Sequence, residues 1–327
     1  MVIGQFASID HLWDHVIRSL LDGGCAMPSR DGDTIEMMGS HLQLLDINAN
    51  FLMSGGRDLS PIYAAGEMLW YLAGSNDGGQ IMHYAPSYKR FLEQDGTAWG
   101  AYGERFDRYD QIDHIMAMLH EKPDSRQAVM TIYDPMDLIQ AAAGSKKDIP
   151  CTLSLQFLVR NGELNLIVTM RSNDVWFGLP YDVFCFSTLQ ALLAEGLGLE
   201  NGWYVHQAGS IHLYKKHISN AKQASVIGPC PVALKYERSL MDFKSSMAEA
   251  VAWERLLRCQ YKRFDSAIVT ELIETFGMGT RWTTLLGLAW MQTLPPLDTE
   301  TQTQGFDLLM PNLLMRDGIS ARRGQRQ

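Results

Sequence analysis

Residues 150–182 read Pro-Cys-Thr-Leu-Ser-Leu-Gln-Phe-Leu-Val-Arg-Asn-Gly-Glu-Leu-Asn-Leu-Ile-Val-Thr-Met-Arg-Ser-Asn-Asp-Val-Trp-Phe-Gly-Leu-Pro-Tyr-Asp. Apolar residues alternate over 153–159 and again over 164–170, which is the period of a strand with one buried face. The Asn-Gly pair at 161–162 is a strong signal for a type I′ hairpin turn. The hairpin therefore predicts that Cys151, at the start of one strand, lies beside Arg171, at the end of the other.

Helical patterns lie on both sides of this hairpin. Residues 8–22 carry apolar positions at helical spacing, with Ser8 as a plausible N-cap and glycines at 23–24 as the stop. Residues 61–73 predict a mostly apolar helix that contains Glu67, and a charge there is costly unless it is paired or functional. The remaining expectations are a buried helix at 187–196, short strands at 203–206 and 210–215, helices at 240–275, and a polar, irregular chain from about 292.

The composition is that of a globular protein with a large core. The chain has 327 residues, of which 46% are hydrophobic and 20% charged, and a net charge of −9. This charge argues against a nucleic-acid surface but allows a free nucleotide held by a few arginines. No apolar run approaches the roughly 20 residues of a membrane span, and no signal peptide is evident. The odd number of irregularly spaced cysteines (25, 151, 185, 230, 259) predicts a cytoplasmic protein without disulfides or a metal site.

Several polar residues could carry chemistry. Cys151 is either a buried structural thiol or a nucleophile, and a neighbouring Arg171 would favour its thiolate. Arg171-Ser172 is either a surface pair or a phosphate clamp, with Arg30 and Arg126 as further phosphate candidates. His212 and Tyr214 are two apart on a predicted strand and so face the same side, either packed or turned to a sugar hydroxyl.

The motifs also stand in a characteristic order. They are Arg30, Glu67-Met-Leu-Trp70, Tyr102-Gly103, Asp124-Ser-Arg126, Pro150-Cys151, Arg171-Ser172-x-Asp174, Gly178-x-Pro180 and His212-x-Tyr214. Over roughly residues 8–235 this set resembles thymidylate synthase and its pyrimidine hydroxymethylase relatives. The resemblance implies an α/β (α+β) fold with a mixed sheet flanked by helices, packed sheet to sheet in a homodimer. We expect residues 1–240 to form the catalytic domain and 241–327 a divergent C-terminal helical extension.

The resemblance also assigns roles. Cys151 would attack C6 of a pyrimidine nucleoside monophosphate, and C5 would then take the one-carbon unit of 5,10-methylenetetrahydrofolate. Glu67 would organise proton transfers, and Tyr102 would lie near the C5 proton. The phosphate would be bound by Arg30, Arg171, Ser172 and the partner subunit's Arg126, and the ribose by His212 and Tyr214. The folate would be bound by Arg57, Tyr88, Phe91, Asp174, Gly178 and Tyr181.

One departure bears on the base. Thymidylate synthases have an Asn that reads uracil, and this chain has Asp182 at that position. In this respect the chain resembles the dCMP hydroxymethylases. Cytosine presents N3 as an acceptor and its N4 amino group as a donor, which a carboxyl group matches. Against uracil, a carboxylate oxygen would face O4 with no proton between them, a mismatch that costs about 1–3 kcal/mol when buried. The residues therefore predict a cytosine nucleotide, with dCMP preferred and CMP possible.

Other departures bear on the product. The family's His after the nucleophile is Thr152, its two folate-side Trp residues align with Tyr88 and Phe91, and Asp148 stands where Leu usually lines the pocket. A wetter site would let water add to the exocyclic methylene, giving a hydroxymethyl group and releasing tetrahydrofolate. We therefore expect a hydroxymethyltransferase.

Three alternatives stay open: a cytosine C5-methyltransferase that retains the reductive step, a dUMP enzyme, and a non-catalytic nucleotide-binding protein. Ser210 and Gln127 replace a family Asp and Arg, so we expect phosphate or sugar binding to differ in detail. The family's closing tail is not recognisable in residues 322–325. No residue decides between ribose and deoxyribose, or between phage DNA modification and nucleoside-antibiotic synthesis as the pathway.

Overall fold

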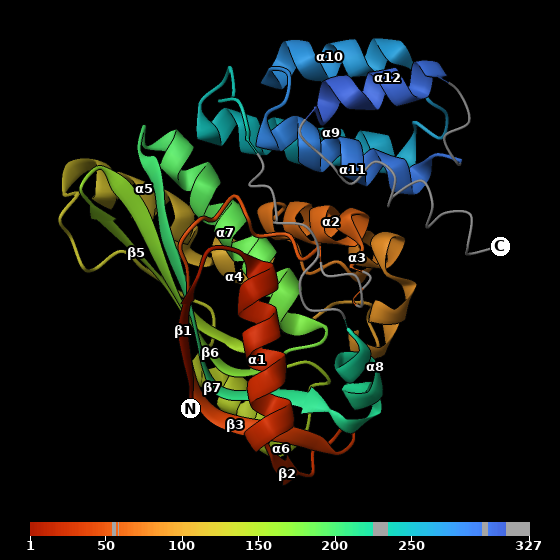
Figure 1. The fold of residues 1–327 in the computed structure, drawn as a ribbon. Coiled ribbons are helices and arrows are strands. Elements are labelled where there is room, and N and C mark those ends of the chain that lie inside the picture. Colours follow the sequence, from red (N-terminus) through yellow and green to blue (C-terminus); the bar gives the residue numbers. More distant parts are fainter. Residues whose placement is uncertain (54–56, 58, 225–234, 296–299, 312–327) are drawn as a thin grey trace. The chain divides into compact units, whose positions relative to one another are not determined.

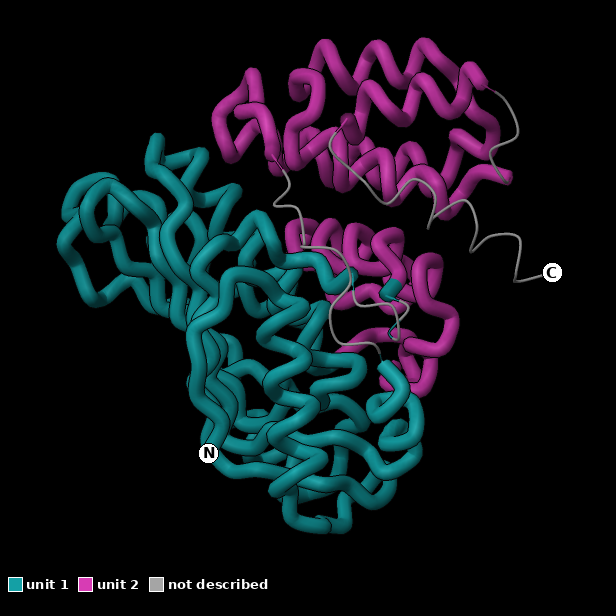
Figure 2. Tube along the Cα trace, in the orientation of Figure 1, with its two compact units in different colours: residues 1–59, 99–233 teal, residues 60–98, 234–327 magenta. Residues whose placement is uncertain are grey.

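The structure is a computed structural model that describes residues 1–327 except 54–56, 58, 225–234, 296–299 and 312–327. Cys230 and the tail at 322–325 lie outside the described residues. The chain divides into two compact units (Figure 2). The first comprises residues 1–59 and 99–233, and the second comprises residues 60–98 and 234–327. This division differs from the expected boundary at residue 240. The assignment of residues 1–240 to a catalytic domain and of residues 241–327 to a C-terminal extension remains a prediction.

A mixed β-sheet forms the framework of the first unit (Figure 1). Its strand order is β1-β3-β7-β6-β5-β4, with β2 paired to β3. The β1–β3 and β6–β7 pairs are parallel and the others antiparallel, as the predicted mixed sheet requires. The strands are β1 (Val2–Phe6), β2 (Cys25–Met27), β3 (Thr34–Leu44), β4 (Val129–Thr131), β5 (Thr152–Arg160), β6 (Glu163–Asp174) and β7 (Glu200–Tyr214).

The predicted hairpin is confirmed as β5 and β6. Asn161 and Gly162 have φ angles of 54° and 81°, as a type I′ turn requires at both central positions. At the other end of the hairpin, the backbone N–H of Arg171 donates to the carbonyl oxygen of Cys151 at 2.8 Å. The two residues are therefore neighbours, as the alternation pattern indicated.

Helices complete the first unit: α1 (Ile9–Gly23), α4 (Tyr102–Asp107), η2 (Arg108–Asp110), α5 (Gln111–Glu121), α6 (Pro135–Ala143), α7 (Gly178–Gly196), η3 (Lys215–His217) and α8 (Ile218–Gln223). Ser8 caps α1 as predicted. The buried helix expected at 187–196 is only the second half of α7, which starts earlier because Pro180 is tolerated in a first helical turn. The two short strands expected at 203–206 and 210–215 are one continuous strand, β7.

The buried side of β6 and β7 changes phase at one point. In β6, Val168 and Met170 are buried and the next buried residue is Asn173, while in β7 the change follows Ala208. The parallel pairing skips residues 171 and 209, where a β-carbon on Gly209 would lie 3.1 Å from the Arg171 carbonyl oxygen. Irregularities of this kind re-aim side chains beside functional sites. Here the irregularity turns the Asn173 side chain toward the core.

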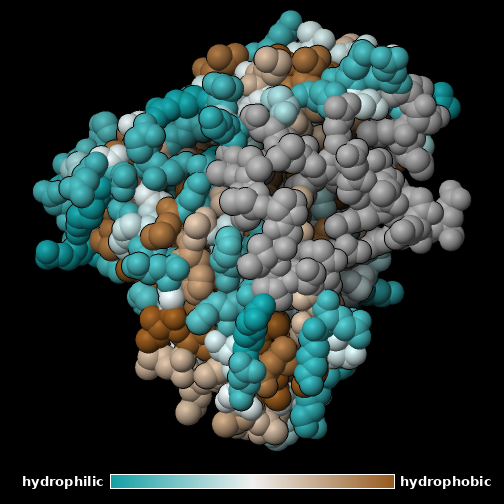
Figure 3. Space-filling view, in the orientation of Figure 1, coloured by the Kyte–Doolittle hydropathy of each residue, from teal (hydrophilic) through white to brown (hydrophobic). Residues whose placement is uncertain are grey.

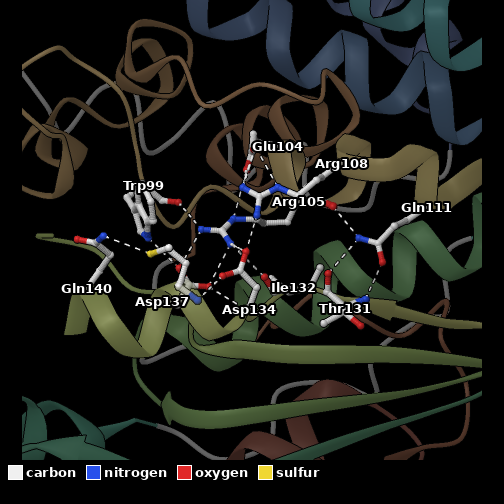
Figure 4. A network of polar contacts seen from close by, with 11 residues as sticks. Trp99, Glu104, Arg105, Arg108, Gln111, Thr131, Ile132, Asp134, Asp137 and Gln140 are labelled. Carbon is white, nitrogen blue, oxygen red and sulfur yellow. Dashed lines mark hydrogen bonds and ion pairs between the residues drawn. The ribbon is translucent and has the colours of Figure 1, made fainter. Parts of the chain in front are cut away.

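A buried network of charges holds helix α4, which begins with Tyr102 (Figure 4). The Arg105 guanidinium, 2% exposed, donates to both carboxylate oxygens of the fully buried Asp137 at 3.0 and 3.1 Å. It also donates to the carbonyl oxygen of Trp99 at 3.0 Å. Asp137 lies in the first turn of α6, where it forms a capping box with Asp134. The network thereby fixes α4 to α6.

The second unit is helical. It contains α2 (Pro61–Leu72), α3 (Gly78–Tyr84), η1 (Pro86–Phe91), α9 (Phe243–Cys259), α10 (Ser266–Phe276), α11 (Arg281–Thr293) and α12 (Glu300–Leu309). The predicted helix at 61–73 is confirmed as α2, with Ser60 as its cap, and the helices at 240–275 are confirmed as α9 and α10. The irregular chain expected from 292 is wrong for residues 300–309, which form α12.

One buried carboxylate helps to join residues 60–98 to the C-terminal helices, alongside the packing of α2 on α11 and α9. Glu254 of α9 is 2% exposed and accepts hydrogen bonds from Tyr84 at 2.7 Å and Gln80 at 3.1 Å, both in α3. Arg258, one turn further along α9, donates to it at 2.8 Å. A buried carboxylate with three partners is stable only when all of them are present. Segments about 170 residues apart are thereby joined within this unit.

In the described residues, no helix is long and apolar enough to cross a bilayer.

The surface of the first unit includes exposed apolar side chains. Ile3, Met27 and Met38, on β1, β2 and β3, are all more than 40% exposed. The space-filling view shows hydrophobic residues gathered at the lower end of the first unit (Figure 3). The expected sheet-to-sheet homodimer remains a prediction.

Candidate active site

Cys151 is half-buried at the start of β5, in the first unit. Burial raises the pKa of its thiol to about 11, and the carboxylates of Asp148 and Asp182 act in the same direction. The cations of Arg171 and Arg30 oppose this shift. Arg171 thus has the predicted sign of effect, but burial outweighs it, and Cys151 is a thiol at neutral pH.

Arg171 ties down the residues that precede the thiol. Its Nε donates to the carbonyl oxygen of Pro150 and its Nη2 to that of Ile149, both at 2.9 Å. An Arg side chain has five N–H donors, so these bonds leave about three for an anion. Arg30 lies in the exposed loop between β2 and β3, where it pairs with Asp31 at 3.4 Å.

Tyr102 lies beside the nucleophile. Its hydroxyl accepts a hydrogen bond from the Thr152 backbone N–H at 3.3 Å, and its ring stacks on Phe186. Burial raises the pKa of Tyr102 well above its usual value, and the charges of Asp182 and Cys151 reinforce the shift. The fully buried Thr152 hydroxyl has no hydrogen-bond partner among the described residues. A ligand polar group next to Cys151 could satisfy it.

Asp182 lies in the first turns of α7 and is held by β6. The side-chain amide of Asn173, 3% exposed, donates to Asp182 Oδ2 at 2.7 Å. Gly178 leaves room for this bond, because a β-carbon there would lie 3.0 Å from Asn173 Nδ2 and 3.3 Å from Asp182 Oδ2. The carboxylate is therefore held within electrostatic reach of Tyr102 and Cys151.

The predicted sugar-binding residues share one face of the sheet. The Ser172 hydroxyl lies 3.5 Å from His212 Nδ1, and the rings of His212 and Tyr214 are almost perpendicular at 5.3 Å. Burial lowers the pKa of His212, while Asp174 and Glu36 act in the opposite direction.

Sequence reasoning missed Glu36. It lies in β3 directly opposite His212, and its Oε1 accepts a hydrogen bond from the Ser210 hydroxyl. The family's Asp at position 210 is therefore absent, but a carboxylate from the neighbouring strand reaches the same place. Only the register of β3 on β7 reveals this, because the two residues are 174 positions apart.

Asp174 and its neighbours form a second cluster on the first unit. Its carboxylate accepts from the backbone N–H groups of Trp176 at 2.9 Å and Phe177 at 3.4 Å, and burial raises its pKa. The Arg57 guanidinium lies 5.5 Å from the Trp176 ring and 4.9 Å from the Phe177 ring. The His217 ring stacks on Trp176, and its buried Nε2 has no hydrogen-bond partner among the described residues. A carboxylate, an unpartnered ring nitrogen and aromatic faces fit a flat, hydrogen-bonding heterocycle such as a pterin.

The structure does not join every predicted residue to Cys151. Arg126 is exposed, and among the described residues its guanidinium has no ion pair, so its expected role at a partner's phosphate stays a prediction. Tyr181 is half-buried in the first turn of α7. The roles expected for both residues rest on the family resemblance.

Three predicted site residues belong to the second unit. Glu67 is buried in α2 and accepts a hydrogen bond from Tyr63 at 2.8 Å, so the charge in this apolar helix is partnered. The Tyr88 ring lies edge-on to Trp70 at 5.6 Å and to Phe91 at 5.3 Å. The place of Glu67, Tyr88 and Phe91 in the Cys151 site stays a prediction.

Comparison with known proteins identifies the family. A family model described as thymidylate synthase matches residues 11–250. The chain belongs to the thymidylate synthase family. The chain is similar to the solved structure of thermostable thymidylate synthase A from Bacillus subtilis, with a TM-score of 0.58 and 25% sequence identity. The match covers 66% of this chain and 83% of that one, which confirms the predicted fold class.

A curated relative in this thymidylate synthase family comes from Bacillus phage SP01. It is named deoxyuridylate hydroxymethyltransferase and is 36% identical over 174 residues. The match covers 49% of this chain and 45% of the relative, so the chain matches just under half of that protein's length.

Proposed function

We propose that this protein transfers a one-carbon unit from 5,10-methylenetetrahydrofolate to C5 of a cytosine nucleoside monophosphate, as a hydroxymethyl group. Membership of the thymidylate synthase family supports one-carbon transfer to a pyrimidine nucleotide. The name of the phage relative supports the hydroxymethyl product. The observation that carries the choice of cytosine is the carboxylate of Asp182, fixed by Asn173 beside Cys151.

The choice of base follows from hydrogen-bond matching. An ionised carboxylate only accepts hydrogen bonds. A cytosine adduct protonated at N3 offers two donors, N3–H and the N4 amino group, so it suits Asp182. Uracil offers N3–H and the acceptor O4, and O4 would face a carboxylate oxygen without a proton between them. Sites built on such pairs discriminate strongly, because the mismatched group stays buried and unpaired.

The nucleophilic step belongs to Cys151. Its thiol, with a pKa of about 11, must lose its proton when the nucleotide binds. The sulfur then bonds to C6 of the base, and the displaced π electrons make C5 nucleophilic. Arg171 and Arg30 are the cations that favour the thiolate, and we assign them with Ser172 to the nucleotide phosphate. Arg126 would reach the phosphate of the partner subunit in the homodimer.

The folate, when bound, supplies the carbon that becomes the new substituent on C5. We assign its pterin to the cluster around Asp174, His217 and Trp176, with Arg57 facing its tail, because that donor set fits the group. Tyr102, whose raised pKa keeps its hydroxyl protonated, would lie near the proton that leaves C5. Glu67 would organise the proton transfers, and Gly178 and Tyr181 would border the folate.

The hydroxymethyl product requires water at the new carbon. Asp148 interacts electrostatically with Cys151, so a hydratable carboxyl group lies within electrostatic reach of the nucleophile where the family usually has an apolar side chain. Tyr88, with Phe91, replaces the larger tryptophan pair expected on the folate side. Both changes favour addition of water over the reductive step that would give a methyl group.

Product mass decides among the candidates. The protein is incubated with methylenetetrahydrofolate and dCMP, CMP or dUMP separately, with the Cys151→Ala variant as the inactive control. A hydroxymethyl adduct on a cytosine nucleotide alone is the expected result, and the better of dCMP and CMP defines the sugar preference. A methyl adduct would contradict the hydroxymethylase. Equal values for the parent and the Cys151→Ala variant would contradict catalysis altogether.

A second candidate function is hydroxymethylation of dUMP. The name of the phage relative favours it, because that protein is described as acting on deoxyuridylate. Turnover of dUMP alone in the same assay would support this candidate and would mean that Asp182 does not select cytosine.

A further inference from the structure

The Asp182 carboxylate terminates a chain of buried hydrogen bonds in the first unit. The Tyr204 hydroxyl lies 2.9 Å from His206 Nδ1, and His206 Nε2 lies 3.2 Å from Asn173 Oδ1. Asn173 Nδ2 donates to Asp182 Oδ2 at 2.7 Å. Tyr204 and His206 are 0% exposed and Asn173 is 3% exposed. We call Tyr204, His206 and Asn173 the relay.

The chemistry of the groups gives the relay a direction. A carboxylate only accepts, so Asn173 turns its amide nitrogen to Asp182 and its oxygen to His206. That oxygen requires a proton on His206 Nε2. Burial lowers the pKa of His206 to about 3, so the ring is neutral and its Nδ1 accepts from the Tyr204 hydroxyl. Burial also raises the pKa of Tyr204 well above its usual value, which keeps that hydroxyl protonated.

We infer that Asn173, His206 and Tyr204 are positioning residues for base selection, which hold Asp182 as an oriented hydrogen-bond acceptor. This inference rests on the proposed function, in which Asp182 reads the base. If the hydrogen bonds of the relay ran in the opposite direction, a protonated Asp182 would donate to Asn173, and His206 Nδ1 would carry a proton. The Tyr204 hydroxyl would then need a different acceptor. The relay therefore favours the ionised carboxylate, the form that matches a cytosine adduct and opposes uracil O4.

Two further observations support a specific role. The phase change in β6 is what turns Asn173 into the core, where an apolar side chain would be the less costly occupant. Gly178 leaves the Asn173–Asp182 bond unobstructed, since a β-carbon there would lie 3.0 Å from the amide nitrogen. The titratable groups within electrostatic reach of Asp182 include Cys151, Tyr102 and Tyr204.

The direction of the relay can be measured without turnover. Nitrogen-15 NMR of histidine-labelled protein reports which ring nitrogen of His206 carries the proton, with the His206→Gln variant to assign the signal. We expect a neutral ring protonated on Nε2 at pH 7. A ring protonated on Nδ1, or a charged ring, would overturn the relay whatever the substrate is.

The effect on selectivity is tested with four variants. Asn173→Ala and the nearly isosteric Tyr204→Phe remove donors from the relay, whereas His206→Gln keeps a donor for Asn173 and an acceptor for Tyr204. The control is Asn165→Ala, another buried asparagine of β6, whose amide bonds only to backbone groups among the described residues.

The readout is kcat/KM for dCMP divided by kcat/KM for dUMP. We expect Asn173→Ala to lower this ratio about 10-fold or more, because it removes one hydrogen bond to a charged group. Tyr204→Phe should lower the ratio less, His206→Gln should stay near the parent, and Asn165→Ala should leave it unchanged. If Asn173→Ala changes the ratio no more than Asn165→Ala does, the relay does not position Asp182. A parent that prefers dUMP would contradict the proposed function, while the tautomer measurement would still decide the relay.

Discussion

Replacing Asp148 with Asn should make the Cys151 thiol more reactive at neutral pH. Burial is the largest cause of the raised thiol pKa, and the carboxylates of Asp148 and Asp182 add to it. Asn keeps the shape of Asp, which matters because a β-carbon on Gly100 would already lie 2.6 Å from Asp148 Oδ2. The variant therefore removes a charge with little change in packing.

The magnitude follows from the thiol pKa. A rise from 9.0 to about 11 lowers the thiolate fraction at pH 7 from about 1 in 100 to about 1 in 10,000. One carboxylate that faces a titrating group typically shifts its pKa by about one unit or more. Asp148→Asn should therefore raise the alkylation rate of Cys151 about 10-fold at any pH well below the pKa.

The assay is alkylation by iodoacetamide between pH 6 and 9, with each cysteine followed by peptide mass spectrometry. The exposed Cys25 and Cys259 serve as internal references for reagent and pH. Plots of log rate against pH should be parallel for the parent and the variant, with the variant line higher by about one unit. Coincident lines, or a slower variant, would refute the electrostatic account of the nucleophile.

Three other predictions concern stability and nucleotide binding. The pKa of His206 is lowered to about 3, against about 6.5 in an unfolded chain, so the unfolding free energy should fall by up to about 4–5 kcal/mol as the pH drops from 6.5 to 3. Urea titrations should show this loss in the parent and a smaller one in His206→Gln. Asp137→Ala removes the fully buried partner of Arg105 and leaves that guanidinium its longer contacts to Glu104 at 3.2 Å and Asp134 at 3.4 Å, so it should cost about 3 kcal/mol of unfolding free energy, against under about 1 kcal/mol for the exposed Arg18→Ala. Glu36→Gln should raise the nucleotide KM about 5-fold without altering base preference, because it weakens one hydrogen bond beside His212; an altered base preference would contradict that assignment.

Short sequence patterns correctly predicted the strands and helices whose form depends on a few neighbouring residues. The turn at 161–162 and the alternation on both sides of it identified β5 and β6, since only a few residues are needed to set strand period and turn type. The N-cap Ser8 did the same for α1. The same reasoning divided β7 in two, because its pattern changes phase after Ala208, and a phase change is indistinguishable from a break without the neighbouring strand.

The groups around the site that sequence reasoning missed all depend on contacts between distant segments. Glu36 is recognisable only from its register opposite His212, and Asn173 only from the irregularity that turns it inward. The direction in which Arg171 shifts the pKa of Cys151 was predicted correctly, but the net pKa could not be predicted, for a related reason. A neighbouring Arg171 is visible in a hairpin pattern, whereas the burial that outweighs it is set by the whole unit.

Overall similarity is a weak guide to the base, because few atoms decide between cytosine and uracil. The phage relative is 36% identical over 174 residues, and its name specifies deoxyuridylate. Asp182 could serve uracil if it were protonated, since its hydroxyl would then donate to O4. Asn173 opposes that form, because an amide donor 2.7 Å from the carboxylate favours the charged state. The burial that keeps His206 neutral holds the amide in that orientation. In a uracil enzyme Asp182 would have to be protonated, and the hydrogen bond from Asn173 disfavours that form. We therefore expect the double variant Asn173→Ala with Asp182→Asn to turn over dUMP better than the Asp182→Glu variant does. The reverse order would mean that the carboxylate itself is required for uracil, and that the preference for cytosine proposed here is wrong.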